Sequence, residues 1–301
     1  MDQTQTASAT RGWDASLAGR LGDATITAPL SAAANTEAIV TVKRFGFAIL
    51  QSEPTALTES AINRRRRELH EFGSALGTPV FQSPRRELVE DVKDFSDVES
   101  GDDRGYRSGG ELKAHSDPPT LIVLHCVQPA KSGGESSLVS VASIVARMPA
   151  ADPALIDELM RPFPDWRIAG QDGAPEAGPA PRPRPVLALH GGTLSCVLYR
   201  PFIELAADAL GTPLRPEQTA ALDLFEACSL NDNLTLRFVL QPGQTLVLHN
   251  RSVLHARTDY TDWPELDRRR HLLRMWIDAP ESFPVHPDHA LGDLFASPSV
   301  L

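Results

Sequence analysis

The chain has 301 residues, 42% of them hydrophobic, which is enough to bury a sizeable core in one large domain. Its formal net charge of −10 and pI near 5.4 argue against a nucleic-acid-binding protein, because phosphate binding depends on clustered Lys and Arg. The one dense basic run, Arg64 to Arg67, opens a helix-like segment and is interpreted as a solvated helix face. We therefore expect a small-molecule ligand rather than a nucleic acid.

Cysteine usage and hydropathy indicate the compartment. The three cysteines, Cys126, Cys196 and Cys228, have no metal-like spacing and are interpreted as reduced, mostly buried thiols of a cytoplasmic protein. The first thirty residues do not resemble a secretion signal. No window approaches the roughly 18 consecutive apolar residues of a membrane span, so no membrane association is expected. The sequence does not decide between a monomer and a homo-oligomer.

The N-terminal half is predicted to mix helices and strands. Residues 1–30 are predicted to be a flexible polar arm, followed by one domain over 31–301. Apolar periodicity and turn residues give the elements that follow. They are helices over 36–43, 59–76, 140–148 and 152–160 and strands over 46–50, 88–92 and 121–127. His125 lies inside the last strand and is interpreted as a core histidine hydrogen-bonded to backbone, with a fourth metal ligand as the alternative.

The C-terminal half contains a proline-rich segment, 170–185, which cannot hold a helix or a central strand and is expected to be either a plain surface loop or a lid over the pocket. After it we expect a hairpin around Gly191-Gly192. The remaining elements are helices over 201–210 and 216–228 and strands over 234–240, 245–249 and 270–277. Many short strands with a few helices predict a mainly β fold with α, a double-stranded β-helix (jelly roll) buttressed by helices.

The segment GGELKAHSDPPT holds a candidate metal motif. In an extended segment, His115 and Asp117 point to the same side while Ser116 points away. On its own this pair is a weak signal and is more typical of a polar strand end or turn. Far downstream, His255 offers a second imidazole, and two histidines with one carboxylate form the facial triad of non-haem Fe(II) oxygenases.

The last predicted strand tests this hypothesis. If it is extended, Arg270, Leu272, Arg274 and Trp276 share one face, which places two guanidinium groups inside the barrel. Buried arginines without anions are costly, so this arrangement predicts anionic ligands. The alternative is that both arginines pair with internal Asp or Glu.

Four motifs resemble one known family. They are HSD at 115–117, GGES at 133–136, LHAR at 254–257 and RRHLLR at 269–274. In this order they resemble the taurine dioxygenase (TauD/TfdA) and clavaminate synthase group of Fe(II)/2-oxoglutarate-dependent oxygenases, over roughly residues 46–278. The resemblance implies oxidation of a C–H bond of a small anionic substrate, an amino acid or natural-product carboxylic acid, with Fe(II), 2-oxoglutarate and O2, and with succinate and CO2 as co-products.

The resemblance also implies roles for single residues. The metal ligands would be His115, Asp117 and His255. Arg270 and Ser136 would hold the distal carboxylate of 2-oxoglutarate, Ser136 standing where the family usually has threonine, and Arg274 would face the anionic group of the substrate. Tyr106, Tyr199 and Trp276 are candidates for lining the pocket, with ordinary packing as the alternative.

Two departures from the family pattern leave the substrate open. Residues 112–114 lack the aromatic often found before the HSD motif, and the loop between His255 and Arg270 is a few residues longer than in the taurine enzyme.

Two other classes of protein are compatible with the fold. One is a cupin-type metal-dependent isomerase or hydrolase without 2-oxoglutarate, which would not need Arg270; the other is a non-catalytic binding protein.

Overall fold

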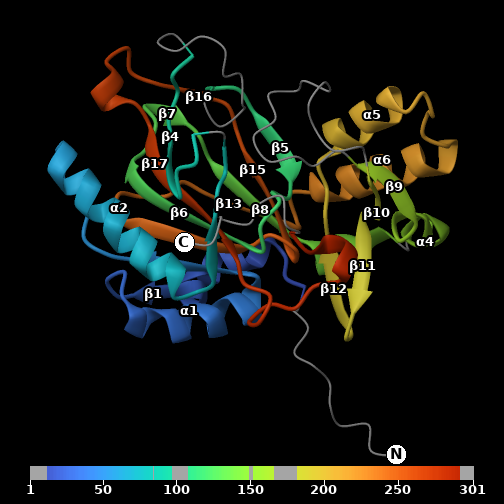
Figure 1. Cartoon of the computed structure of the whole chain (residues 1–301), viewed down its shortest axis with the longest axis horizontal. Helices are drawn as coiled ribbons and strands as arrows, with labels where there is room; N and C mark the ends of the chain where they lie inside the picture. The colour runs from blue at the N-terminus through green and yellow to red at the C-terminus, as the bar shows by residue number, and fades with distance from the viewer. Residues whose placement is uncertain (1–11, 84, 97–107, 149–151, 166–181, 292–301) are drawn as a thin grey trace, which may run out of the picture.

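Two β-sheets face each other in the structure, with helices packed around them (Figure 1). The computed structural model describes residues 12–83, 85–96, 108–148, 152–165 and 182–291. Strands predominate in the two central layers, so the chain is mainly β with helices, as the sequence predicted.

The larger sheet has seven strands and is antiparallel except for its first pair. Its order is β1 (Thr25–Thr27), β2 (Phe47–Gln51), β14 (Gln244–His249), β6 (Leu121–Gln128), β17 (His271–Asp278) and β3 (Thr78–Val80), with β4 (Val89–Val92) also paired to β17. The outer face of this sheet packs against helices α1 (Ala32–Phe45) and α2 (Glu59–Ser74) through Leu273, Met275 and Ile277. A Cβ at Gly73 would lie 2.5 Å from the Met275 sulfur, so glycine allows α2 to approach β17.

The smaller sheet has four antiparallel strands and carries two of the motifs. Its order is β13 (Thr235–Phe238), β8 (Ser136–Ser140), β15 (Val253–Arg257) and β5 (Leu112–His115). Leu138 and Leu236 from this sheet join Ile122, Leu246 and Leu272 from the larger sheet in one buried cluster. The inner faces of the two sheets therefore form the central core. Strand β15 was not predicted from the sequence.

A helical region lies beside the smaller sheet (Figure 1). It contains α3 (Val141–Arg147), α4 (Ala154–Leu159), α5 (Arg200–Ala209), α6 (Pro216–Ser229) and the hairpin of β11 (Leu187–His190) and β12 (Thr193–Cys196). Gly191 and Gly192 have φ of 56° and 78°, which a tight two-residue hairpin requires and which favours glycine. The remaining short elements are β7 (Ser132–Gly133) paired with β16 (Tyr260–Thr261) and the 3-10 helices η1 (Ala15–Ala24), η4 (Leu266–Arg268) and η5 (Pro287–His289).

The predicted flexible arm is wrong from residue 12 onward. Helix η1 is followed by β1, which pairs in parallel with β2. Leu17 and Ala24 are buried in the core between the sheets, and Trp13 Nε1 donates to the Phe45 carbonyl at 2.7 Å. These tertiary contacts hold a segment whose composition is polar. Residues 1–11 lie outside the described residues.

The prediction of a loop over residues 170–185 is wrong for its last four residues, 182–185. Strand β10 (Arg182–Pro185) pairs antiparallel with β9 (Pro162–Asp165), and Arg184 Nε lies 3.0 Å from Asp165 Oδ2. A two-stranded sheet tolerates prolines because each strand has a free edge. Residues 170–181 lie outside the described residues, so the choice between loop and lid stays a prediction.

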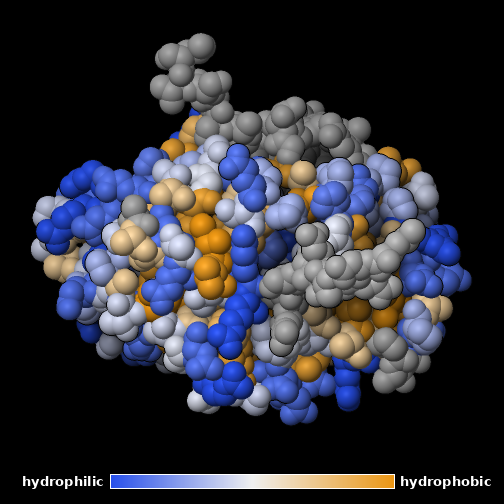
Figure 2. All heavy atoms as spheres, turned by 90° about the horizontal axis from the view of Figure 1, so that it is seen from below, coloured by the Kyte–Doolittle hydropathy of each residue, from blue (hydrophilic) through white to orange (hydrophobic). Residues whose placement is uncertain are grey.

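The exposed large hydrophobic residues of the described part of the chain come from several different elements. On the face shown in Figure 2, hydrophilic residues predominate and hydrophobic ones appear between them in narrow strips. Exposed examples such as Val40, Leu189 and Leu230 belong to different parts of the chain. None of the helices in the described part of the chain combines the length and hydropathy needed to cross a bilayer.

Two buried histidines are held neutral in the core. His125 contacts the hydroxyls of Thr55 and Thr245 at 3.1 and 2.8 Å, so it is a core histidine as predicted, with side-chain rather than backbone partners. His249 lies 2.8 Å from the Ser252 hydroxyl. Burial lowers the pKa of each to about 3.

We expect the free energy of unfolding to fall as the pH is lowered from 7 to 5. The unfolded chain takes up protons near pH 6.5, whereas folded His125 and His249 accept them only near pH 3, so stability rises with pH between these values. Each histidine makes the free energy of unfolding change with pH by up to about 1.4 kcal/mol per pH unit. Urea unfolding of a His125→Gln variant at several pH values should show a shallower slope, and a variant at exposed His190 should keep the wild-type slope.

Candidate metal centre

Three side chains of types that can bind a metal ion meet beside two neighbouring strands, β5 and β15. His115 ends β5, Asp117 follows it by two residues, and His255 lies in the middle of β15, directly opposite His115 in the register. His115 Nε2 is 3.7 Å from Asp117 Oδ1, and His255 Nε2 is 3.7 Å from Asp117 Oδ2. One ligand atom of each residue lies within 4.8 Å of the others. This arrangement is the donor set of a facial triad.

The two imidazoles turn their Nε2 atoms toward Asp117. His115 Nδ1 lies 2.7 Å from the Lys113 carbonyl, which can only accept a hydrogen bond, so Nδ1 donates to this carbonyl. Burial lowers the pKa of His255 to about 3, and the neighbouring His115 acts in the same direction. His255 is therefore neutral at pH 7, which is the form of imidazole that binds a metal ion.

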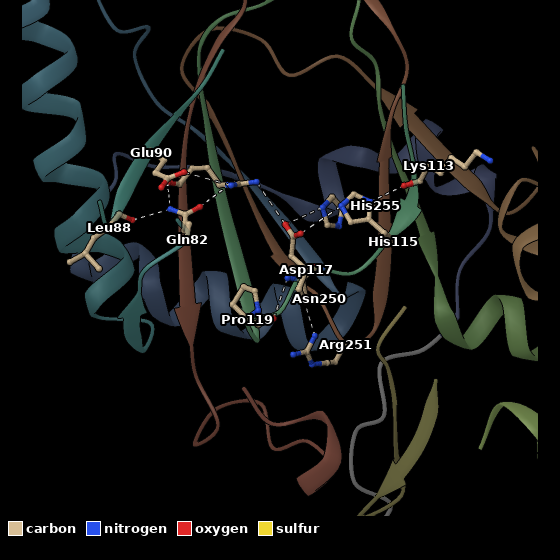
Figure 3. A network of polar contacts seen from close by, with 11 residues as sticks. Gln82, Leu88, Glu90, Lys113, His115, Asp117, Pro119, Asn250, Arg251 and His255 are labelled. Carbon is tan, nitrogen blue, oxygen red and sulfur yellow. Dashed lines mark hydrogen bonds and ion pairs between the residues drawn. The ribbon is translucent and has the colours of Figure 1, made fainter. Parts of the chain in front are cut away.

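Backbone contacts fix the position of the Asp117 loop (Figure 3). Ser116 points away from the metal ligands, as predicted, and its backbone N–H and hydroxyl bond the backbone of Leu198 at 2.8 and 2.9 Å. Arg251 donates to the carbonyls of Asp117, at 2.9 Å, and Pro118. Asn250 accepts from the Asp117 N–H at 3.4 Å. Asn250 and Arg251 belong to the turn between β14 and β15, so the segment that leads to His255 also holds Asp117.

A cavity between the two sheets contains these three residues in its wall. Strands of the larger sheet contribute apolar side chains such as Leu246 and Leu272, and β8 contributes Leu138 and Ser136. Arg257, Arg270 and Arg274 also line the cavity. The sequence reasoning missed Arg257 as a site residue, although it follows His255 by two positions on β15 and so shares its face.

The two arginines predicted to point inward differ in their partners. Arg274 donates from Nε to Gln82 Oε1 at 2.6 Å, and its Nη atoms lie 3.9 Å from Glu90 and 4.0 Å from Asp117. Figure 3 shows Gln82 and Glu90 on one side of this network and Asp117 on the other. Arg270 Nη1 is buried and has no hydrogen-bond partner, and burial lowers the pKa of Arg270. The alternative of internal pairing thus holds for Arg274, while Arg270 has no carboxylate against its guanidinium in the described part of the chain.

The other candidates have more ordinary places. Arg269 donates to the carbonyls of Asp94, Trp263 and Pro264 and so anchors backbone. The Tyr199 ring packs edge-on to His115 with centroids 5.6 Å apart, and the Arg274 guanidinium lies 5.2 Å from the Trp276 ring. Tyr106 lies outside the described residues.

We expect Glu90→Gln to lower the free energy of unfolding by about 3 kcal/mol, because it removes a buried carboxylate that faces a buried guanidinium. In a double-mutant cycle with Arg274→Met, we expect the free energy of unfolding of the double variant to fall by less than the sum of the two single losses. The difference should be about 1 kcal/mol or more. Urea unfolding measures all four proteins. The exposed Glu204→Gln, which faces Arg200, serves as the control and should change stability by about 0.5 kcal/mol or less. Strict additivity of the two single losses would show that Glu90 and Arg274 do not interact.

Comparison with known proteins identifies the family. The family described as "Taurine catabolism dioxygenase TauD, TfdA family" matches residues 8–276 of the chain. The chain belongs to this family. FR-33289 synthase of Streptomyces rubellomurinus is 30% identical over 243 residues, which are 78% of this chain and 69% of the synthase. A uridine-5'-phosphate dioxygenase of a Streptomyces species is 27% identical over 256 residues, 80% of this chain and 88% of that protein.

Solved structures show the same fold. An asparagine oxygenase in complex with Fe(II), a hydroxyasparagine and succinate matches 92% of this chain and 94% of its own with a TM-score of 0.57 at 18% identity. The non-haem iron oxygenase OrfP in complex with Fe and α-ketoglutaric acid matches 88% of this chain and 90% of its own, with a TM-score of 0.57 at 14% identity. As a TauD/TfdA family member, the chain is a non-haem dioxygenase that uses Fe(II) and 2-oxoglutarate, as the resemblance implied.

Proposed function

We propose that His115, Asp117 and His255 hold the Fe(II) ion, and that Arg270 and Ser136 hold the distal carboxylate of 2-oxoglutarate. The observation that carries this proposal is the convergence of two imidazoles and a carboxylate in the wall of a cavity that is also lined by Arg270, whose buried Nη1 has no hydrogen-bond partner among the described residues. The donor set suits Fe(II) because it occupies three positions on one side of the ion and leaves three for ligands.

The bound Fe(II) would supply the redox chemistry that couples O2 and the conversion of 2-oxoglutarate to succinate and CO2 to oxidation of a substrate C–H bond. The contribution of the chain is positional. Arg270 offers a charge-assisted hydrogen bond that fixes the far end of the co-substrate. The apolar wall formed by Leu138, Leu246 and Leu272 limits water beside the metal ligands.

We propose that the two sheets are the halves of a double-stranded β-helix and that the chain is one catalytic domain. Support comes from the shared core cluster, in which the inner faces of both sheets meet, and from the cavity that opens inside it. Because η1 and β1 pack on this core, the domain includes the segment from residue 12 as well as residues 31–301. Three free, buried cysteines fit a cytoplasmic location.

We propose a small substrate with an anionic group, an amino acid or a natural-product carboxylic acid. Arg274 lines the cavity 4.0 Å from Asp117, so an anion bound to Arg274 would lie close to the metal ligands, with the oxidised carbon only a few bonds away. Because Glu90 already faces Arg274, a substrate that also carries an ammonium group suits this end of the cavity better than a multiply charged anion. Screening small acids for substrate-triggered succinate release tests this proposal, and release triggered only by large neutral compounds would contradict it.

We expect His255→Ala to abolish succinate release and to reduce Fe(II) binding below detection, because the remaining pair gives only two ligands. Anaerobic calorimetry with Fe(II) measures the binding, and circular dichroism checks that the fold is retained. The exposed His190→Ala is the matched control and should behave like the wild type. Full activity of His255→Ala would remove this residue from the metal site.

We expect Arg270→Ala to weaken 2-oxoglutarate binding by about thirtyfold or more, since a charge-assisted hydrogen bond to a carboxylate contributes on the order of 2 kcal/mol. Titration of the Fe(II)-loaded protein without oxygen measures this affinity directly. Arg268→Ala, at an exposed arginine of the same run, is the control. An unchanged affinity in Arg270→Ala would mean that another group holds the carboxylate.

A further inference from the structure

Two buried guanidinium groups lie in the cavity wall without an anion between them. Arg257 and Arg270 are each only 6% exposed, and both line the cavity. The Nη1 atom of each is buried and has no hydrogen-bond partner. Neither side chain forms an ion pair with a carboxylate within the described residues. Buried polar groups are nearly always satisfied, so two such atoms on residues that line one cavity indicate a missing acceptor.

The surroundings offset only part of this positive charge. The guanidinium carbons of Arg257 and Arg270 lie 4.7 and 5.3 Å from the centroid of the Tyr260 ring, so both make cation–π contacts with it. Because an aromatic ring carries no net charge, these contacts do not neutralise the two buried guanidinium groups.

We propose that Arg257 is a second guanidinium for the distal carboxylate of 2-oxoglutarate, beside Arg270 and Ser136. This proposal rests on the proposed function, in which Arg270 and Ser136 hold that carboxylate. The β15–β8 register places Arg257 directly opposite Ser136, and directly paired residues have their side chains on one face. A carboxylate has four lone-pair positions, enough to accept from the Ser136 hydroxyl and from both Nη1 atoms.

A purely structural role for Arg257 accounts for its other donors only. Its Nε donates to the Thr258 carbonyl at 3.3 Å, and its Nη2 donates to the carbonyls of Ser108, at 3.0 Å, and Gly110. These bonds anchor the segment that leads into β5. They leave Nη1 unexplained, because it remains buried and without an acceptor.

The test compares two keto acids that differ only at the far end. 2-Oxoglutarate and 2-oxobutyrate share the keto-acid group, but 2-oxobutyrate lacks the distal carboxylate. In anaerobic titrations of the Fe(II)-loaded protein, Arg257→Gln should weaken 2-oxoglutarate binding about ten- to thirtyfold and leave 2-oxobutyrate binding unchanged. Arg237→Gln, at a surface arginine on β13 that faces Asp232, is the control and should change neither. An equal loss for both acids, or no loss for either, overturns the assignment.

A second measurement covers the case in which Arg257→Gln does not fold. A crystal structure of the wild type with Mn(II) and 2-oxoglutarate should place Arg257 Nη1 within hydrogen-bond distance of the distal carboxylate. A carboxylate bound to Arg270 alone overturns the role of Arg257 but leaves the proposed function intact. If the wild type binds neither Fe(II) nor 2-oxoglutarate, the proposed function itself fails, and the inference fails with it.

Discussion

The antiparallel register between β5 and β15 is the constraint on which the site depends. It places His255 opposite His115, and the turn that precedes β15 holds the loop containing Asp117 through Asn250 and Arg251. Because side chains alternate along a strand, a slip of one residue would turn His255 to the opposite face. The same strand also pairs with β8, so its register is fixed from both sides.

The arginines that line the cavity differ in their partners. Arg274 faces Glu90 and Asp117, and Gln82 fixes its orientation. The Nη1 atoms of Arg257 and Arg270 have no hydrogen-bond partner, and neither guanidinium forms an ion pair with a carboxylate of the described residues. In a low-dielectric interior this difference is large, so an anion gains more beside Arg257 and Arg270 than beside Arg274. The position of each arginine along the strands therefore decides which ligand group it suits.

The sequence predicted those parts of the fold in which the apolar pattern is strong. Helix α2 and strands β6 and β17 were placed within a few residues, because their buried faces are continuous. Strand β15 was missed because it has only five residues, so the alternation of Leu254 and Ala256 with His255 and Arg257 is too short to stand out as a strand. The burial of η1 depends on contacts with distant residues, such as that between Trp13 and Phe45, which no local pattern encodes.

The cluster of His115, Asp117 and His255 could be predicted from the sequence because the order and spacing of the motifs are specific, whereas the position of Arg257 could be seen only once strand β15 was known. Once β15 is known, the alternation of its side chains shows which of its residues point into the cavity. His255 faces Leu138, and Arg257 faces Ser136 at the next inward position of the two strands. Two residues along a strand span about 7 Å. The pleat of this strand pair therefore fixes the separation between His255 and the polar pair of Arg257 and Ser136, and it places both on the inward face.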